Sequence, residues 1–242
     1  MAYSKLVKHG AGPLDAGPPR KDRSVNIAII GTGNVGKALG SSLTKVGHHV
    51  TYAARSADDT KSAAQATGGT AAASLSEAAA GAEVVVIAVP YVSAAREVAT
   101  AIAPVISGKI VIDATNPIKA DGSGLATEGG PSGAENFASW LPGARVVKAF
   151  NTIFASVQAD PTTLGVKIDA LYATDDDRAC VVVSELLSSI GFRPVYVGPL
   201  ARARELEAIA NLNINLQIQA QGDWRTSVNF VGAPAASTNL PK

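Results

Sequence analysis

The chain contains 242 residues with a formal net charge of +1; 47% of the residues are hydrophobic and 17% are charged. This length can bury a sizeable core, and the near-neutral charge excludes a strong electrostatic attraction to nucleic acid or to an anionic membrane. Cys180 is the single cysteine, so an internal disulfide is excluded, and its apolar neighbours predict a buried core thiol. We therefore expect a cytoplasmic protein that binds neither nucleic acid nor a membrane.

Both ends of the chain differ in composition from the middle. Residues 1–24 mix glycine, proline and charged residues without an apolar run. This composition predicts a flexible N-terminal arm rather than a secretory signal, or else an arm that packs on a second subunit. Residues 199–242 are expected to form a C-terminal helix and an irregular tail. The helical pattern near Pro199 is apolar on more than one face, which predicts a largely buried helix.

Residues 25–198 alternate short apolar runs with helical patterns, and we expect them to form one domain. Strands are expected at residues 25–30, 49–54, 83–89, 109–113, 145–149, 170–174 and 194–197. Helices are expected directly after the first glycines and at residues 58–66, 93–103 and 176–190. This alternation predicts an α/β fold of the Rossmann type, with a doubly wound, mostly parallel sheet and a small C-terminal helical extension. The Gly-, Ser- and Pro-rich stretch 116–132 predicts a functional or mobile loop.

A glycine-rich motif follows the first expected strand. Its residues are Gly31, Thr32, Gly33, Asn34, Val35 and Gly36. A strand before the motif and a helix after it form the context in which such glycines bind a dinucleotide. Gly31 permits a tight turn, Gly33 lets the backbone approach a pyrophosphate, and Gly36 lets the helix pack closely on the strand. The phosphates are then expected at the positive helix N-terminus, and the alternative is a glycine turn without a ligand.

The end of the second expected strand decides between NAD and NADP. An Asp or Glu there would bind the adenine ribose hydroxyl and repel a 2′-phosphate, but this chain has Arg55 and Ser56. An arginine fork and a hydroxyl suit a 2′-phosphate, and Lys61 on the following helix adds positive charge. NADP is therefore the expected cofactor. The alternative is a surface arginine that pairs with Asp58 or Asp59.

Further strand ends point to the same edge of the expected sheet. The backbone of Val89 and Pro90 is expected beside the ribose and nicotinamide, because ligands bind outside the carboxyl ends of parallel strands. Asp113 more often caps a turn than acts as a base, and Asn116 follows it in the same turn. The polar segment at the end of the sixth strand favours a ring-binding role, with a supporting structural role as the alternative. Its candidate residues are Ala149, Asn151 and Thr152.

The histidines show no pattern typical of a metal site or a hydrolytic triad. His9, His48 and His49 lack the spacing of metal ligands, and the last two are expected on the side opposite the glycine motif. We therefore predict no metal, and we assign no residue as catalytic.

Several segments together resemble the NADP oxidoreductases of the coenzyme F420-dependent group and the cytosolic domain of six-transmembrane ferric reductases. They are residues 29–37, 53–56, 114–117, 147–152, 198–200 and 204–207. The resemblance implies hydride exchange between NADP(H) and a deazaflavin (coenzyme F420) or flavin that lies face to face with the nicotinamide. It also implies that Thr32, Arg55 and Ser56 contact the cofactor phosphates and that residues 149–153 line the second ring. Such a transfer needs positioning more than acid–base chemistry.

Two other functions stay open at this point. One is an NADPH-dependent reductase of a small organic carbonyl or imine, although only a short segment follows Pro199 here. The other is a non-catalytic module that senses NADP. A homodimer is expected because the last helix is very apolar for the surface of a monomer, and the alternative is an internal groove that covers this helix. The other expected partner is a small-molecule substrate or a second redox cofactor.

Overall fold

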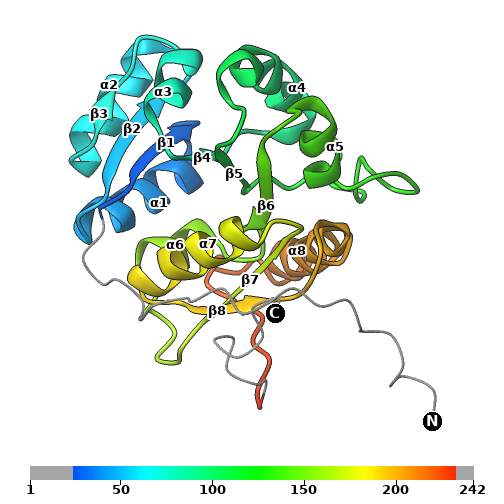
Figure 1. Ribbon diagram of the computed structural model, residues 1–242. Helices are drawn as coiled ribbons and strands as arrows, with labels where there is room; N and C mark the ends of the chain where they lie inside the picture. Colours follow the sequence, from blue (N-terminus) through cyan, green and yellow to red (C-terminus); the bar gives the residue numbers. More distant parts are fainter. Residues whose placement is uncertain (1–23, 233–242) are drawn as a thin grey trace, which may run out of the picture.

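The computed structural model describes residues 24–232, and these form one sheet with helices on both faces (Figure 1). The strands are β1 (Asn26–Ile30), β2 (His49–Ala53), β3 (Thr70–Ala71), β4 (Val84–Ile87), β5 (Ile110–Asp113), β6 (Arg145–Ala149), β7 (Asp169–Thr174) and β8 (Arg193–Tyr196). The α-helices are α1 (Asn34–Lys45), α2 (Ala57–Thr67), α3 (Leu75–Gly81), α4 (Tyr91–Ile102), α5 (Gly133–Trp140), α6 (Ala155–Ala159), α7 (Asp177–Ser189) and α8 (Ala203–Ala220). The predicted N-terminal arm over residues 1–24 lies outside the described residues except for Ser24.

The strand order confirms the predicted Rossmann-type fold. The eight strands of the described residues lie in the order β3-β2-β1-β4-β5-β6-β7-β8. Neighbouring strands are parallel except β6 and β7, which are antiparallel. The order reverses between β1 and β4, because the chain returns to the centre of the sheet after β3 and continues outward on the other side. Open α/β sheets bind their ligands at such a reversal, outside the carboxyl ends of the strands.

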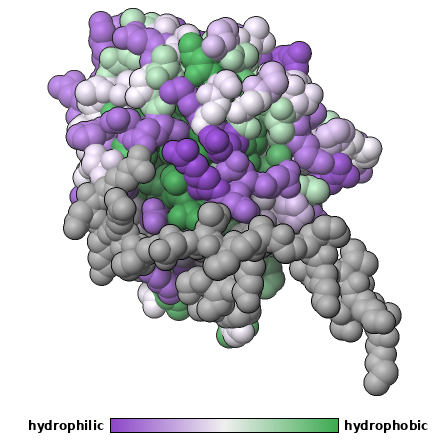
Figure 2. Space-filling view, viewed as in Figure 1, coloured by the Kyte–Doolittle hydropathy of each residue, from purple (hydrophilic) through white to green (hydrophobic). Residues whose placement is uncertain are grey.

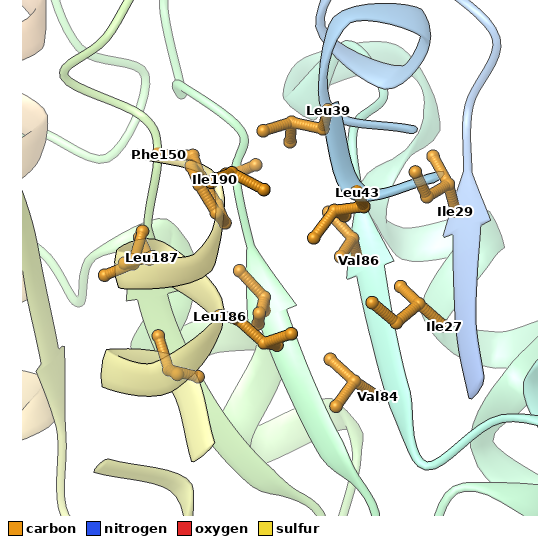
Figure 3. Close-up of a cluster of buried hydrophobic side chains, with 14 of the residues drawn as sticks. Ile27, Ile29, Leu39, Leu43, Val84, Val86, Phe150, Leu186, Leu187 and Ile190 are labelled. Carbon is orange, nitrogen blue, oxygen red and sulfur yellow. The ribbon is translucent and has the colours of Figure 1, made fainter. Parts of the chain in front are cut away.

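Alternate residues of the central strands face opposite layers of helices. Ile27 and Ile29 of β1 pack in one cluster with Leu39 and Leu43 of α1, and Figure 3 shows Leu186 of α7 in the same cluster. The intervening strand residues pack in a second cluster with α3, α4 and α5. Because both faces are covered, β4 is buried at every position, as expected for the centre of a parallel sheet.

The structure also contains short elements that hydrophobic periodicity does not predict, namely β3, α3, α5 and α6. Ser132 and Glu135 form a capping box at the start of α5, and Ser74 caps α3 by accepting from the backbone N–H of Glu77. Serine followed three residues later by glutamate is a sequence signal for a helix start. In α3 this signal is present, but its mostly alanine face gives only a weak apolar pattern.

The prediction that the last helix is largely buried is wrong for α8. Leu212, Leu216 and Ile218 are 73%, 54% and 54% exposed. The inward positions of the same half of the helix are polar, because Asn213 and Gln217 bind residues of the following tail. On the face drawn in Figure 2, hydrophilic and hydrophobic residues are mixed. Several outward positions in the second half of α8 are therefore apolar while its inward positions are polar.

Candidate functional site

The glycine motif forms the turn between β1 and α1. Gly31 has a φ of 119°, which favours glycine, and a Cβ on it would overlap the carbonyl oxygen of Ala88 at the end of β4. A Cβ on Gly36 would overlap the carbonyl oxygen of Gly31. The two glycines therefore let β1, β4 and α1 approach one another closely where the strand order reverses.

The N-terminus of α1 carries backbone donors that no side chain caps. Its N-cap is Gly33, and its first turn contains no acidic residue. Helices α2, α3, α5 and α7 are instead capped by Ser56, Ser74, Ser132 and Asp176. Nothing lies within 4 Å of the place that a Cβ of Gly33 would take. The positive end of α1 thus faces open space, which suits a phosphate group.

A cavity of ≈ 550 Å³ opens beside this turn. The predicted site residues along its wall are Gly31, Thr32, Gly33, Arg55, Ser56, Val89 and Pro90. Leu75, Ala94 and Val98 give the cavity an apolar side, which suits the face of an adenine ring. The size and the lining fit the adenosine and pyrophosphate part of a dinucleotide.

Arg55 supplies a positive charge at the end of β2. Its side chain is exposed and, within residues 24–232, it forms no ion pair with Asp58 or Asp59. The hydroxyl oxygen of Ser56 accepts from the backbone N–H of Asp59 at 3.1 Å, which leaves the hydroxyl proton able to donate. Asp59 lines the same cavity, so the cavity wall carries both a positive and a negative side chain. Lys61 is exposed on α2 and does not line this cavity.

The other predicted contacts lie apart from this cavity. Ala149, Asn151 and Thr152 are buried, and neither they nor Asn116 belong to its wall. The side-chain amide of Asn151 donates to Asn116 Oδ1 at 3.1 Å and to the carbonyl of Leu206 at 3.0 Å. In return, Asn116 donates to the carbonyl of Asn151 at 2.9 Å. These bonds join the loop after β5, the end of β6 and α8, so they give Asn116 and Asn151 a structural role.

Lys148 of β6 is completely buried with two carboxylates. Its Nζ donates to Asp113 Oδ2 and to Glu207 Oε1, each at 2.9 Å, and to the carbonyl of Thr115 at 2.7 Å. Burial by itself lowers the pKa of a lysine, but the two carboxylates outweigh this effect and hold the pKa of Lys148 above its usual value. Burial raises the pKa of Glu207. The buried Glu207 carboxyl therefore favours its neutral form more than an exposed glutamate does.

The buried cluster is the feature that sequence reasoning missed. Lys148 and Glu207 are 59 positions apart, so no local motif contains both. Glu207 Oε1 also accepts from the backbone N–H of Gly133 at 2.9 Å, which attaches α8 to the start of α5. The predicted turn-capping role of Asp113 is confirmed, because its Oδ1 accepts from the backbone N–H of Thr115 at 2.9 Å. A lysine within the mostly apolar strand β6 was the available signal.

The other titratable residues that the structure describes give no sign of a metal site or a reactive thiol. Within residues 24–232, no group of three or more His, Cys, Asp or Glu could hold a metal ion. His48 accepts from the backbone N–H of Val25 at 3.3 Å, and burial lowers its pKa. Cys180 is buried as predicted, and burial raises the pKa of its thiol. Among the helices that the structure describes, none is long and apolar enough to cross a membrane.

Comparisons with known proteins show which family and which folds the chain resembles. Residues 26–117, which include the glycine motif and Arg55, match the family model described as NADP oxidoreductase coenzyme F420-dependent. Metalloreductase STEAP3 of Rattus norvegicus is 33% identical over 190 residues, which cover 76% of this chain and 36% of that protein. The chain thus spans about a third of the length of this curated relative.

Two solved structures share both the fold and part of the sequence. A candidate F420-dependent NADP reductase from Arthrobacter sp. FB24 is 28% identical with a TM-score of 0.76, covering 86% of this chain and 100% of that one. A hypothetical protein from Sinorhizobium meliloti is 34% identical with a TM-score of 0.65, covering 73% of this chain and 86% of that one. Residues 26–117, with their glycine turn at the strand reversal, thus belong to the family of coenzyme F420-dependent NADP oxidoreductases.

Proposed function

We propose that this chain transfers hydride between NADP(H) and coenzyme F420 or a related flavin. The observation that carries the cofactor assignment is Arg55, which stands on the wall of the cavity beside an uncapped helix N-terminus. No acidic residue occupies the position directly after β2, where it would bind the ribose hydroxyl of NAD. Family membership supports the same cofactor.

In this proposal, the residues of the chain bind NADP(H) and orient it toward the acceptor. When bound, NADPH would supply a hydride and become NADP+, and the reduced acceptor would take up one proton from solvent. The turn from Gly31 to Gly36 holds the pyrophosphate by backbone donors, while Arg55 and Ser56 hold the 2′-phosphate by charge-assisted and hydroxyl hydrogen bonds. Hydride transfer depends mainly on the placement of the two rings, so the proposal requires no acid or base from the protein.

Arg55→Ala tests the cofactor assignment. Loss of charge-assisted bonds worth about 1.5–3 kcal/mol lowers NADPH affinity about tenfold to a hundredfold and leaves NADH affinity nearly unchanged. Titration of the full chain with both cofactors measures the ratio, and Arg178→Ala is the matched control, because Arg178 is exposed on α7. An unchanged ratio of the two affinities in Arg55→Ala would refute the assignment.

Asp59 provides an independent test because it lines the same cavity with the opposite charge. If a 2′-phosphate binds near Arg55, Asp59→Asn removes a nearby repulsion and increases NADPH affinity a few-fold. If Asp59 instead binds the ribose hydroxyl of NAD, the same substitution lowers NADH affinity without improving that for NADPH. The second result would transfer the cofactor assignment to NAD.

Stopped-flow oxidation of NADPH tests the acceptor. Coenzyme F420, FMN and FAD are offered separately to the purified chain, and the nicotinamide absorbance is followed. Rapid turnover with one of them supports the proposed reaction and identifies its acceptor. Tight NADPH binding without turnover on any of the three contradicts the flavin-type acceptor and favours a small organic substrate or a sensing module.

We also propose that the chain forms a homodimer through α8. Its exposed apolar residues Leu212, Leu216 and Ile218 lie in residues 208–222, which contain no charged side chain, so two copies meet there without like-charge repulsion. Light scattering of the wild type is expected to give the mass of two chains, and Leu212→Asp that of one. A monomeric wild type would overturn the proposed homodimer.

The cytoplasmic location stays a prediction that rests on the single cysteine.

A further inference from the structure

A second cavity, of ≈ 730 Å³, lies along the outer side of α1. Its walls come from α1, the end of α2, α6 and the tail residue Trp224, and it shares no residue with the first cavity. Asn34 and Val35 begin this groove, and they directly follow Gly33 of the glycine motif. An occupant of the groove would therefore lie next to a dinucleotide held at the N-terminus of α1.

Two aromatic side chains form one wall of the groove. Phe154 and Trp224 pack edge to face, with ring centroids 5.2 Å apart and an interplanar angle of 87°. Trp224 is 43% exposed. A half-exposed indole held by a phenyl ring offers a flat apolar surface on which a planar conjugated ring can pack.

The tail holds Trp224 in place at a conformational cost. Trp224 has a φ of 59°, which is unfavourable for a residue with a side chain. Its backbone N–H donates to Gln217 Oε1 at 2.8 Å, and its carbonyl accepts from the hydroxyl of Ser156. A Cβ on Gly222 would overlap the same Gln217 side chain, so the glycine permits this approach. Helices α6 and α8 thus fix the indole at the edge of the groove.

The charge of the groove defines the second property of its ligand. Lys37 is the one charged residue on its wall, and Asn34, Ser41, Thr67 and Ser156 are the polar ones. The Lys37 side chain is exposed, and within the described residues it forms no ion pair or hydrogen bond. A groove with an aromatic wall, one cation and no carboxylate is complementary to a planar ring that carries an anionic group.

We propose that this groove binds the hydride acceptor of the proposed reaction, as a tricyclic flavin or deazaflavin ring with a phosphorylated side chain. The ring packs against Phe154 and Trp224, and the phosphate lies at Lys37. This inference rests on the proposed function, because only the reaction requires a second ring beside the dinucleotide. It goes beyond that function by assigning the acceptor to residues of α1, α6 and the tail.

Binding of FMN and riboflavin, which share one ring and differ in the phosphate, tests the assignment. Each flavin is titrated into the full chain and followed by flavin fluorescence. The wild type is expected to bind FMN more tightly than riboflavin. Lys37→Gln brings FMN affinity down to that of riboflavin, whereas Lys45→Gln, on the same helix but outside the groove, leaves both unchanged. Trp224→Leu weakens both flavins about tenfold because it removes the stacking surface, and Trp224→Phe restores most of the affinity.

NADPH affinity, measured in the same variants, separates the two proposals. If the groove binds the acceptor, Lys37→Gln and Trp224→Leu retain NADPH affinity and lose flavin affinity. If turnover with a flavin or F420 is unaffected by both substitutions, the reaction stands and this groove is not its acceptor site. If FMN competes with NADPH and loses affinity in Arg55→Ala, FMN occupies the first cavity and the inference is wrong.

Discussion

Two regions at the carboxyl edge of the same sheet use polar groups in opposite ways. At the glycine turn, the N-terminus of α1 has no capping side chain, and Arg55 has no partner within the described residues. At the ends of β5 and β6, Lys148, Asp113 and Glu207 are buried and bind one another. The first region keeps its donors available for a ligand, whereas the second uses them within the fold.

This difference shows which polar residues at strand ends are candidates for binding. Position at the carboxyl edge is shared by both regions, so position alone does not identify a ligand contact. The decisive feature is whether the donors and acceptors already have partners. Five substitutions test this distinction.

Lys148→Met is expected to cost about 3–5 kcal/mol of unfolding free energy, because it leaves two carboxylates buried without their positive partner. Denaturant unfolding measures the loss, with Lys45→Met on the exposed end of α1 as the control. A loss below about 1 kcal/mol would mean that the cluster is not a structural unit.

Gly36→Ala and Gly33→Ala separate packing from binding at the glycine turn. A Cβ on Gly36 overlaps a backbone oxygen, so this variant is expected to lose about 1–3 kcal/mol of stability as well as NADPH affinity. A Cβ on Gly33 meets no protein atom, so stability changes by about 1 kcal/mol or less while the methyl group blocks the phosphate. Denaturant unfolding measures the stability of both variants, and titration with NADPH measures their affinity for the cofactor. Undiminished NADPH binding by Gly33→Ala would exclude the phosphate from this turn.

Glu207→Gln is expected to change stability by about 1 kcal/mol or less at neutral pH, far less than Lys148→Met. A glutamine oxygen still accepts from Lys148 and Gly133, so the hydrogen bonds of this position are kept. Burial raises the pKa of Glu207 in the folded chain. The protonated carboxyl therefore contributes to the free energy of unfolding below the pKa of the unfolded chain, and this contribution is lost as pH rises through the raised pKa. The variant should therefore lose less stability than the wild type as pH rises. Parallel pH profiles of the two proteins would contradict this account.

Glu135→Gln is expected to have the smallest effect, about 0.5 kcal/mol, because its partner Arg204 is half exposed and water and salt screen the pair. The hydrogen bonds from Arg204 lower the pKa of Glu135 from 4.5 to about 2. Because the pKa is lowered, the ionised Glu135 contributes to the free energy of unfolding above pH 4.5, and this contribution is lost as pH falls through about 2. Acid unfolding of wild type and variant measures it: their difference should vanish at the acid end. A difference that persists there would assign the effect to the helix cap at Ser132.

The sequence allowed prediction of the fold and of several residues that line the first cavity, and particular residues show why other contacts could not be predicted. The glycines and Arg55 were predictable because strand, turn and helix are adjacent in sequence and their spacing is a local property. Asn116 and Asn151 were expected near the rings, yet the structure joins them to each other and to Leu206. The polar character of these side chains was visible in the sequence, but their partners were not.

The sequence by itself determined the alternation of strands and helices, the glycine turn and the absence of an acidic residue directly after β2, because each depends on residues close together in the chain. Only the tertiary structure decided that Glu207 of α8 reaches Lys148 of β6, that Trp224 of the tail packs on Phe154, and that α8 exposes Leu212 and Leu216. These features depend on contacts between distant segments. Hydrophobic periodicity shows that a helix has an apolar face, but it does not show which neighbour covers that face.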